Sequence, residues 1–383
     1  MIRSTVARVD LAALQSNFRA ISDFVATGTD VPSHVRTAAR PHPPSILGVV
    51  KANAYGHGAE RVALALEQAG ATMLACADIE EGIVLRRAGV ARPILVFGAL
   101  SVSDLDGLFE YSLTPTISTP SAARAVQAAA ARHRTVCHYH LKIDTGMNRL
   151  GFRHDNLRRT LPELLSSRNL HLDAVYTHFA TADKPDSDLF DTQRTRFEAA
   201  LAMLDRPVLR HAANSAAVLR DSRVWYDVVR PGLLMYGIVP PPLASTIPLR
   251  PVMSLTSRVV GVKGLRPGET VGYGGRFASA APATVAVVPA GYADGLDLRL
   301  EGRGHVLVRG RRVPIVGAVS MDMMTIDVTG LDDVQPGDEV VIIGSQGSES
   351  WQQIDVREMA AAIGTIPYEI VCRVGSRIER QYT

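Results

Sequence analysis

Eight short apolar runs, separated by stretches with helical periodicity, constrain the fold of this 383-residue chain more than any other feature. They begin 19 to 36 residues apart, and each predicts a strand: residues 46–51, 73–77, 94–98, 114–118, 138–144, 172–178, 208–212 and 227–230. Between them lie amphipathic segments with apolar residues three or four apart, for example Val62, Leu66 and Ala69. Eight strand–helix repeats favour a closed (β/α)8 barrel over an open, doubly wound sheet, which usually has fewer strands.

Two sequence patterns mark where helices begin. Asp10 precedes apolar residues in a 3-4-3-4 spacing, which predicts a helix before the first barrel strand. Asp78 and Glu81 form a D-x-x-E cap, which is typical of the first turn of a helix. Residues 27–45, rich in Pro, Ser and Thr, are expected to form a surface insertion between the first helix and the first strand.

The character of the sequence changes after residue 250. Strand-like runs at residues 254–261, 284–289, 305–308 and 339–343 are separated by Pro-Gly and Gly-rich turns, which is typical of a mainly β domain. The Pro-rich segment 240–251 is the natural linker, and the chain exceeds the size of a single hydrophobic core. We therefore predict an α/β protein with a barrel domain over residues 1–240 and a mainly β domain over residues 241–383.

Composition and charge exclude several classes of protein. Hydrophobic residues make up 46% of the chain and charged residues 21%, so the chain is globular rather than disordered. The net charge is only +3 and its signs are interspersed, which argues against nucleic acid or an anionic membrane as a partner. The chain has no signal-like start and no stretch of about 18 apolar residues. Cys76, Cys137 and Cys372 lack CxxC spacing, which argues against a zinc site and favours a cytoplasmic protein.

Lysine is scarce, because only four of the 41 basic residues are Lys. Only an unprotonated amine is a nucleophile, and Lys can lose its proton whereas Arg cannot. Lys51 ends the first predicted strand, and in a barrel this places it at the carboxyl-terminal mouth, where active sites lie. Desolvation there lowers the pKa of a lysine and suits it to Schiff-base chemistry. The alternative is that Lys51 simply ends a strand.

The loops after the seventh and eighth strands form a second feature. Barrels often bind phosphate there, through backbone N–H groups and small polar side chains. Ser215, Gly232 and Leu233 suit this purpose, although each alone is typical of an ordinary strand-to-helix turn. Their joint placement opposite Lys51 favours a phosphate site.

Three further residues complete the predicted mouth. Lys142 lies within the fifth strand, where a buried ammonium needs a partner. Arg149 follows at the mouth and is placed to bind a carboxylate. His178 ends the sixth strand and is suited to stacking on a cofactor ring, although a lone histidine at a strand end is more often structural.

A series of motifs in the same order resembles the alanine racemase family over residues 8–380. The motifs are VVKANAYGHG at 49–58, KIDTGMNRLG at 142–151, THFATAD at 177–183, ANSAA at 213–217, RPG at 230–232, GYADG at 291–295 and MD at 321–322. The resemblance implies a pyridoxal 5'-phosphate-binding (β/α)8 barrel with a C-terminal β domain. It also implies a head-to-tail homodimer that interconverts L- and D-alanine and supplies D-alanine for peptidoglycan.

The resemblance assigns roles to individual residues. Lys51 matches the Schiff-base lysine, which is also the base on one face of the substrate, and Tyr273 matches the opposing base from the other subunit. Arg230 matches the residue that faces the pyridine nitrogen, and His178 the one stacked on the ring. The cofactor shell is completed by residues that match the phosphate site: Tyr55, Asn214, Ser215, Gly232, Leu233 and Tyr368.

The resemblance extends to the substrate site. Arg149 and Met321 match residues that hold the carboxylate, Lys142 matches a lysine that is often carbamylated in the family, and Tyr292 and Asp322 match the substrate entry. Two positions depart from the family pattern. Ser320 stands where a Cys is frequent, and Leu298 occupies the place of an Arg, with Arg299 beside it, so we expect a rearranged entry.

Three alternatives share much of this pattern. A racemase for serine or for a broader range of amino acids shares every motif. A decarboxylase on the same barrel is disfavoured by Tyr273 and by Arg230. A non-catalytic pyridoxal-phosphate carrier is usually a barrel alone, and about 130 residues after the linker argue against it.

Overall fold

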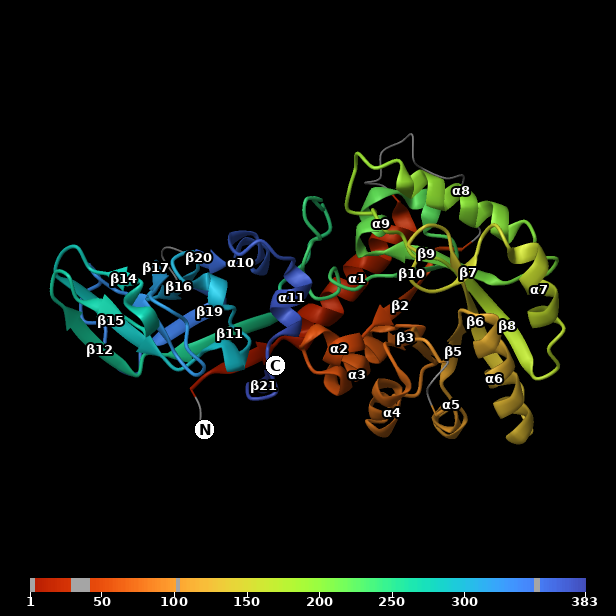
Figure 1. The fold of residues 1–383 in the computed structure, drawn as a ribbon, viewed down its shortest axis with the longest axis horizontal. Helices are drawn as coiled ribbons and strands as arrows, with labels where there is room; N and C mark the ends of the chain where they lie inside the picture. Colours follow the sequence, from red (N-terminus) through yellow and green to blue (C-terminus); the bar gives the residue numbers. More distant parts are fainter. Residues whose placement is uncertain (1–3, 29–41, 101–103, 348–351) are drawn as a thin grey trace. The chain divides into compact units, whose positions relative to one another are not determined.

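The computed structural model describes residues 4–28, 42–100, 104–347 and 352–383 (Figure 1). The chain divides into two units, and each is described by itself. The barrel unit comprises Leu14–Ala54 and Ala59–Leu249, and the β unit comprises Met1–Ala13, Tyr55–Gly58 and Arg250–Thr383. The domain boundary predicted at residue 240 stays a prediction, and most of the insertion predicted at 27–45 lies outside the described residues.

The barrel unit contains a closed parallel barrel, as predicted. In the described part of the chain its eight strands are β2 (Ser45–Val49), β3 (Met73–Cys76), β4 (Ile94–Val96), β5 (Thr114–Ile117), β6 (Cys137–Asp144), β8 (Leu170–Tyr176), β9 (Leu209–Asn214) and β10 (Val228–Arg230). Each pairs with the next in this order, and β10 pairs with β2 to close the ring. A short strand, β7 (Phe152–Arg153), pairs with the end of β6. All eight predicted runs overlap these strands, which confirms the (β/α)8 architecture.

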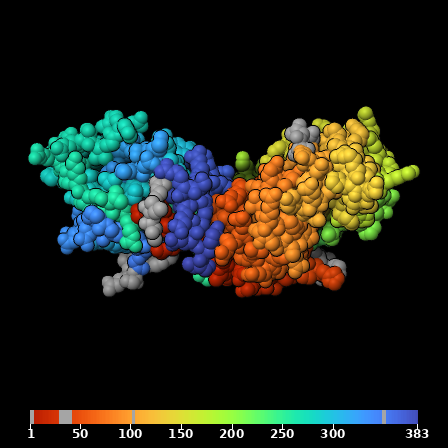
Figure 2. Space-filling view, turned by 90° about the horizontal axis from the view of Figure 1, so that it is seen from below, coloured from red at the N-terminus to blue at the C-terminus, as the bar shows by residue number. Residues whose placement is uncertain are grey.

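Helices surround the strands of this barrel (Figure 1). They are α1 (Leu11–Thr27), α3 (Ala59–Ala69), α4 (Ile79–Arg87), α5 (Asp106–Glu110), α6 (Pro120–Arg132), α7 (Leu157–Leu165), α8 (Leu189–Leu201) and α9 (Ser215–Arg220), with a 3-10 turn at η2 (Ser222–Val224). The predicted cap of α4 is confirmed, because the Glu81 N–H donates to Asp78 Oδ1 at 2.8 Å. In a space-filling view, residues of the α3–α6 region (orange to yellow) cover one side of the barrel (Figure 2).

The β unit is built on a mixed sheet, which confirms the mainly β prediction. Within the described residues the sheet has ten strands: β1 (Val6–Val9), β11 (Met253–Arg258), β12 (Gly261–Leu265), β15 (Ala283–Val288), β16 (His305–Val308), β17 (Arg311–Val316), β18 (Met324–Asp327), β19 (Glu339–Gln346), β20 (Gln352–Ile354) and β21 (Glu379–Tyr382). The smaller elements are β13 (Thr270–Val271), β14 (Phe277–Ala278), η3 (Tyr273–Gly275), η4 (Tyr292–Asp294), η5 (Leu298–Leu300), α10 (Val356–Ala362) and α11 (Pro367–Cys372).

The first strand of the chain belongs to this sheet and was not predicted. β1 pairs antiparallel with β11 and parallel with β21, so Val6 lies opposite Thr256 on one side and Glu379 on the other. These partners lie about 250 and 370 residues away in sequence, and no local pattern identifies them. Among the helices of the described residues, none is long and apolar enough to cross a membrane.

Candidate active site

Lys51 follows β2 directly, at the carboxyl end of the strand, and its side chain is half-buried. The chain then makes a left-handed turn, α2 (Lys51–Tyr55), in which Ala52, Asn53, Ala54 and Tyr55 all have φ of 52–53°. For L-residues this conformation costs about 1–2 kcal/mol per residue. Such strain persists only where the surrounding structure enforces it, and it concentrates at functional sites.

The carboxylate of Glu81 holds this turn in place. Its Oε1 accepts from the Ala52 N–H at 2.7 Å, and its Oε2 accepts from the Ala77 N–H at 2.7 Å. These are the peptides that follow the neighbouring strands β2 and β3, which pair in register. The sequence identified Glu81 only as half of a helix cap. Its position one turn into the helix after the second strand is the signal that could have linked it to Lys51.

A chain of buried polar groups runs along the inside of the barrel from Arg230 on β10. Its guanidinium donates through Nη1 to His211 Nδ1 at 2.9 Å and through Nη2 to His178 Nδ1 at 3.4 Å. His211 Nε2 lies 3.0 Å from His140 Nδ1. Because a guanidinium only donates, His211 must carry its proton on Nε2 and donate it to His140. Arg230 therefore fixes the tautomers of a row of histidines.

Burial keeps these histidines neutral. It holds the pKa of His178 and of His211 well below the usual range, and the charge of Arg230 adds to the effect at both. Burial also lowers the pKa of His140 to about 4 and that of Arg230 to about 10, so the guanidinium stays charged at neutral pH. His178 and Arg230 were predicted from sequence. His140 and His211 were not, because a histidine at an inward strand position has no local signature.

Lys142 points into the same barrel from β6 and is buried. Burial, followed by the charges of Arg149 and Arg230, lowers the pKa of Lys142 to about 8. His178 feels the charges of four cations that lie near it: Arg230, Lys142, Arg149 and Lys51. The structure thus brings together five of the predicted site residues. This concentration of positive charge suits a small ligand that carries several negative charges.

Two of the residues predicted to bind phosphate, Ser215 and Gly232, contact each other. Ser215 is buried, and its Oγ accepts from the N–H groups of Gly232 at 2.8 Å and Leu234 at 3.4 Å. Leu233, between them, is fully buried. The side chain of Asn214 caps α9, because its Oδ1 accepts from the Ala217 N–H at 3.0 Å.

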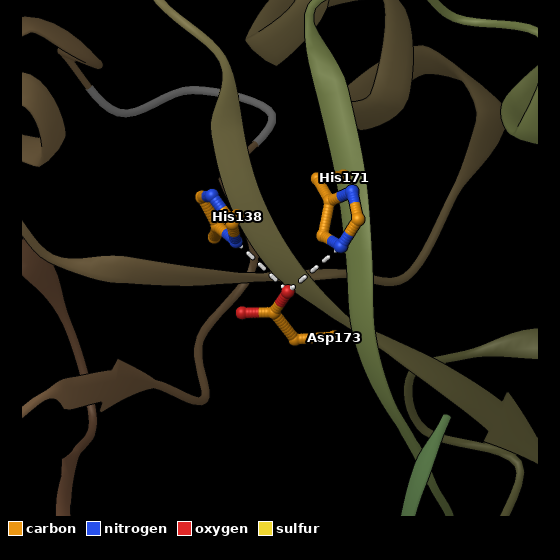
Figure 3. A group of neighbouring side chains, drawn as sticks. All are labelled: His138, His171 and Asp173. Atoms are coloured by element: carbon orange, nitrogen blue, oxygen red, sulfur yellow. Dashed lines mark hydrogen bonds and ion pairs between the residues drawn. The ribbon is translucent and has the colours of Figure 1, made fainter. Parts of the chain in front are cut away.

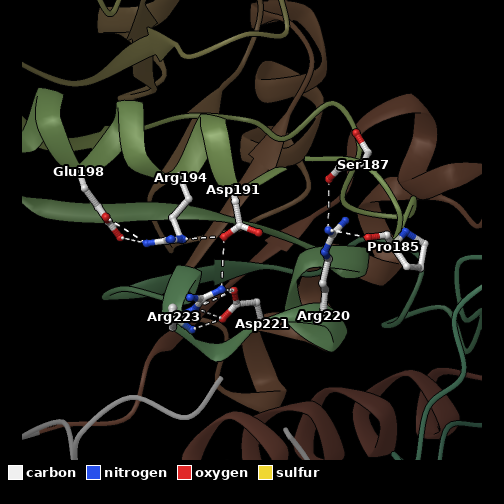
Figure 4. A network of polar contacts seen from close by, with 8 residues as sticks. All are labelled: Pro185, Ser187, Asp191, Arg194, Glu198, Arg220, Asp221 and Arg223. Atoms are coloured by element: carbon white, nitrogen blue, oxygen red, sulfur yellow. Dashed lines mark hydrogen bonds and ion pairs between the residues drawn. The ribbon is translucent and has the colours of Figure 1, made fainter. Parts of the chain in front are cut away.

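The loop that carries His178 is fixed by two further side chains. Arg220, at the end of α9, donates to the carbonyl oxygens of Pro185 at 3.2 Å and Ser187 at 3.4 Å, and a separate contact joins Arg223 of η2 to Asp191 of α8 at 3.3 Å (Figure 4). Gln193, buried on α8, donates to the His178 carbonyl at 2.9 Å and accepts from the Ala180 N–H at 2.8 Å. The backbone around His178 is therefore held from the outer layer of the barrel.

The remaining predicted cofactor residues, Tyr55 and Tyr368, lie in the β unit. Their ring centroids are 5.8 Å apart, and burial raises the pKa of Tyr55 well above its usual range. The glycines that follow Tyr55 serve packing. A Cβ on Gly56 would lie 2.1 Å from the Val371 oxygen and one on Gly58 would lie 1.8 Å from the Tyr382 hydroxyl, and both have positive φ. Close packing and the positive φ therefore explain why glycine occupies positions 56 and 58.

The β unit also holds the residues predicted for the second base and the entry. Tyr273 is 78% exposed, and the side chains of Tyr292 and Met321 are exposed as well. Asp322 Oδ1 accepts from Arg377 Nη2 at 2.6 Å. Their placement at the barrel site stays a prediction.

Leu298 and Arg299 depart from the family pattern at the predicted substrate entry, and the structure shows where each side chain lies. Arg299 binds Asp297 through Nη2 at 2.7 Å and the Ile363 carbonyl through Nη1 at 3.0 Å. Leu298, at the family's arginine position, is exposed. The guanidinium next to the family position is thus tied to its own unit.

Comparisons with known proteins agree along the whole chain. Residues 9–240 match the family model for the alanine racemase N-terminal domain, and residues 252–382 match that for the alanine racemase C-terminal domain. The alanine racemase of Halothermothrix orenii is 38% identical over 386 residues, which cover 99% of this chain and 97% of that protein.

Solved structures show the same likeness. The alanine racemase from D-cycloserine-producing Streptomyces lavendulae superposes with a TM-score of 0.91 at 32% identity, covering 100% of this chain and 98% of that one. The alanine racemase from Bartonella henselae, solved with covalently bound pyridoxal phosphate, superposes with a TM-score of 0.87 at 28% identity, covering 99% of each chain.

Proposed function

The chain belongs to the alanine racemase family of isomerases, and we propose that it interconverts L- and D-alanine with pyridoxal 5'-phosphate held in the barrel. The main support for the proposal is that Arg230, which lies 3.4 Å from His178, and the buried Lys142 share the inside of the barrel, at whose carboxyl end Lys51 lies. A phosphate and a carboxylate are the ligands that such a set of cations favours.

The donor set in the barrel fits the cofactor. The Ser215 hydroxyl accepts from two N–H groups and keeps its own proton to donate to a phosphate oxygen, and Lys51 supplies the amine. Arg230 suits the ring nitrogen, since a guanidinium donates without giving up its proton and leaves that nitrogen unprotonated. When bound, the cofactor delocalises the electron pair left on the substrate Cα after its proton departs. By leaving that nitrogen unprotonated, Arg230 would limit this delocalisation and so disfavour side reactions such as transamination.

The chain itself moves the proton. Lys51 Nζ takes it from Cα on one face, and Tyr273 Oη returns a proton on the opposite face; in the reverse direction the two groups exchange roles. Arg149 and Met321 hold the substrate carboxylate, so that Cα stays between the two bases. Tyr55, Tyr368, Asn214 and Leu233 complete the walls around the phosphate, and Tyr292 and Asp322 line the entry.

Tyr273 is proposed to act in the site of a second copy of the chain. It is 78% exposed on the β unit, together with the exposed side chains of Tyr292 and Met321. A phenol that serves as a base needs a substrate beside it, and a head-to-tail homodimer supplies one at each of two equivalent sites.

Lys142 is proposed to be carbamylated. A pKa of about 8 leaves much of this amine neutral near pH 8, and only the neutral amine attacks carbon dioxide, with release of one proton. The product is an anion beside Arg149, in place of a second cation. Repulsion between the buried Lys142 ammonium and the exposed Arg149 guanidinium then becomes an attraction that orients Arg149.

We also propose that the D-alanine formed supplies peptidoglycan and that the enzyme works in the cytoplasm, where thiols such as those of Cys76 and Cys137 stay reduced. The test of the activity is incubation of the purified protein with L-alanine, followed by chiral chromatography. Equal amounts of both enantiomers at the end support the proposal, and unchanged L-alanine contradicts it. Parallel incubation with serine separates an alanine racemase from one of broader range.

A further inference from the structure

Three ligand-type side chains meet at the amino end of the barrel, opposite the mouth that holds Lys51. His138 begins the inward face of β6, and His171 and Asp173 lie at the start of the neighbouring strand β8 (Figure 3). We propose that His138, His171 and Asp173 form a binding site for a divalent transition metal ion of the zinc class.

The register of the two strands creates the site. His138 and His171 are direct partners in the parallel pairing of β6 and β8, and their ring centroids are 4.9 Å apart. A register shift follows, between Tyr139 and His140, where Asp173 is the extra residue of β8. Residues two apart lie on the same face of a strand, so the Asp173 carboxylate lies beside the His171 imidazole, and it also reaches His138 Nδ1.

The three donor atoms converge on one point. His138 Nδ1 lies 2.8 Å and His171 Nε2 lies 3.6 Å from the same oxygen, Asp173 Oδ1 (Figure 3). All three ligand atoms lie within 4.8 Å of one another. In a tetrahedral zinc site with bonds of about 2.0–2.2 Å, ligand atoms are about 3.4 Å apart. The observed distances of 2.8 Å and 3.6 Å to Asp173 Oδ1 lie on either side of this spacing.

The chemistry of the donors selects the ion. Two imidazole nitrogens and one carboxylate oxygen are ligands typical of Zn²⁺, whereas Mg²⁺ and Ca²⁺ prefer oxygen alone. Three protein ligands leave a fourth position for water. The ion can reach them from solvent, because both histidines are exposed and His171 and Asp173 line a hollow of about 740 Å³.

Nearby cations do not oppose the site strongly. Arg206 and Arg210 line the same hollow, and each is paired with a carboxylate: Arg206 with Asp205 at 3.3 Å and Arg210 with Asp227 at 2.8 Å. The bound ion would link β6 to β8 far from the reacting groups. It would therefore raise the stability of the barrel by mass action and leave the turnover unchanged.

The site is tested by isothermal titration of the metal-stripped holoenzyme with ZnCl2 at pH 7.5. We expect saturation at one ion per chain, and binding at least about tenfold weaker in His171→Asn, since removing even an outer partner of a metal ligand costs 10–100-fold. His305→Asn, which removes an exposed histidine of the β unit, is the matched control and should bind as the wild type does.

A second readout separates a specific site from weak adsorption. Zn²⁺ should raise the thermal midpoint of the wild type and of His305→Asn but not that of His171→Asn or Asp173→Asn, while all four turn over substrate equally. Binding that does not saturate, or equal affinity in the wild type and His171→Asn, overturns the proposal. Because the titration does not depend on racemase activity, either result leaves the proposed function to its own test.

Discussion

Removing the Glu81 carboxylate should misplace Lys51 without unfolding the protein. In Glu81→Ala the N–H groups of Ala52 and Ala77 lose acceptors at 2.7 Å. A hydrogen bond to a charged group contributes about 1.5–3 kcal/mol, so two contribute roughly 3–6 kcal/mol. The Ala52 peptide is exposed, and water replaces part of its bond, which favours the lower end of that range.

The free energy lost with these two hydrogen bonds is comparable to the backbone strain of the left-handed turn. Four residues in the left-handed region, Ala52 to Tyr55, store about 4–8 kcal/mol at about 1–2 kcal/mol each. Without Glu81 the turn can relax and carry Lys51 Nζ away from Cα. A misplacement of about 1 Å costs on the order of 100-fold in rate, so we expect kcat to fall 10- to 100-fold. KM should change only a few-fold, since Arg149 is untouched.

The assay measures kcat, KM and the absorbance of the bound cofactor in Glu81→Ala, Glu81→Gln and a control. Glu81→Gln keeps one acceptor oxygen and should recover part of the lost kcat. Glu80→Gln changes the exposed neighbouring carboxylate and should behave as the wild type does. If Glu81→Ala keeps its kcat within twofold of the wild-type value, Glu81 does not position Lys51.

Three further predictions concern the barrel interior. Borohydride reduction and peptide mapping should place the pyridoxyl group on Lys51; label on Lys142 would contradict the assignment. Lys142→Ala should lose activity and regain part of it with added acetate, and full activity without acetate would rule out the carbamate. His140 alone should lower the unfolding free energy by up to about 3 kcal/mol as pH drops from about 6.5 to 4, because unfolded His140 binds a proton in this window and the folded residue, with a pKa of about 4, does not. His178 and His211, whose pKa values are lowered by burial as well, add to this fall. Urea unfolding at several pH values in this range should show that the unfolding free energy of His140→Asn changes less steeply with pH than that of the wild type. An identical pH dependence would contradict the assignment.

The barrel could be predicted from sequence because its pattern is local. Each parallel strand is a short apolar run followed by its own helix, so periodicity alone identifies both. β1 could not be predicted in this way, since its partners β11 and β21 lie at the other end of the chain. The helix that follows Asp10 could be predicted from the spacing of its apolar residues. The position of β1 before it depends on pairing with strands that are distant in sequence.

The site shows the same contrast. Lys51, Arg230 and His178 stand at strand ends, where barrel active sites lie, and their residue types suggest chemistry. Glu81 could be predicted only as a cap residue. Its carboxylate accepts from the N–H groups of Ala52 and Ala77, which belong to two different loops that only the fold brings together. His211 became recognisable only through the donor-only guanidinium that it faces.

We propose that Lys51 of one chain and Tyr273 of its partner act on opposite faces of the same substrate. Lys51→Ala and Tyr273→Phe should each be nearly inactive, because each removes one of two bases that act as a unit. Random re-pairing of equal amounts gives about half heterodimers, and in each of these one site carries both lesions and the other neither. After subunit exchange verified by native mass spectrometry, the mixture should regain about a quarter of the wild-type activity. A mixture that exchanges subunits and stays inactive would show that both bases come from one chain and that the active site is not shared.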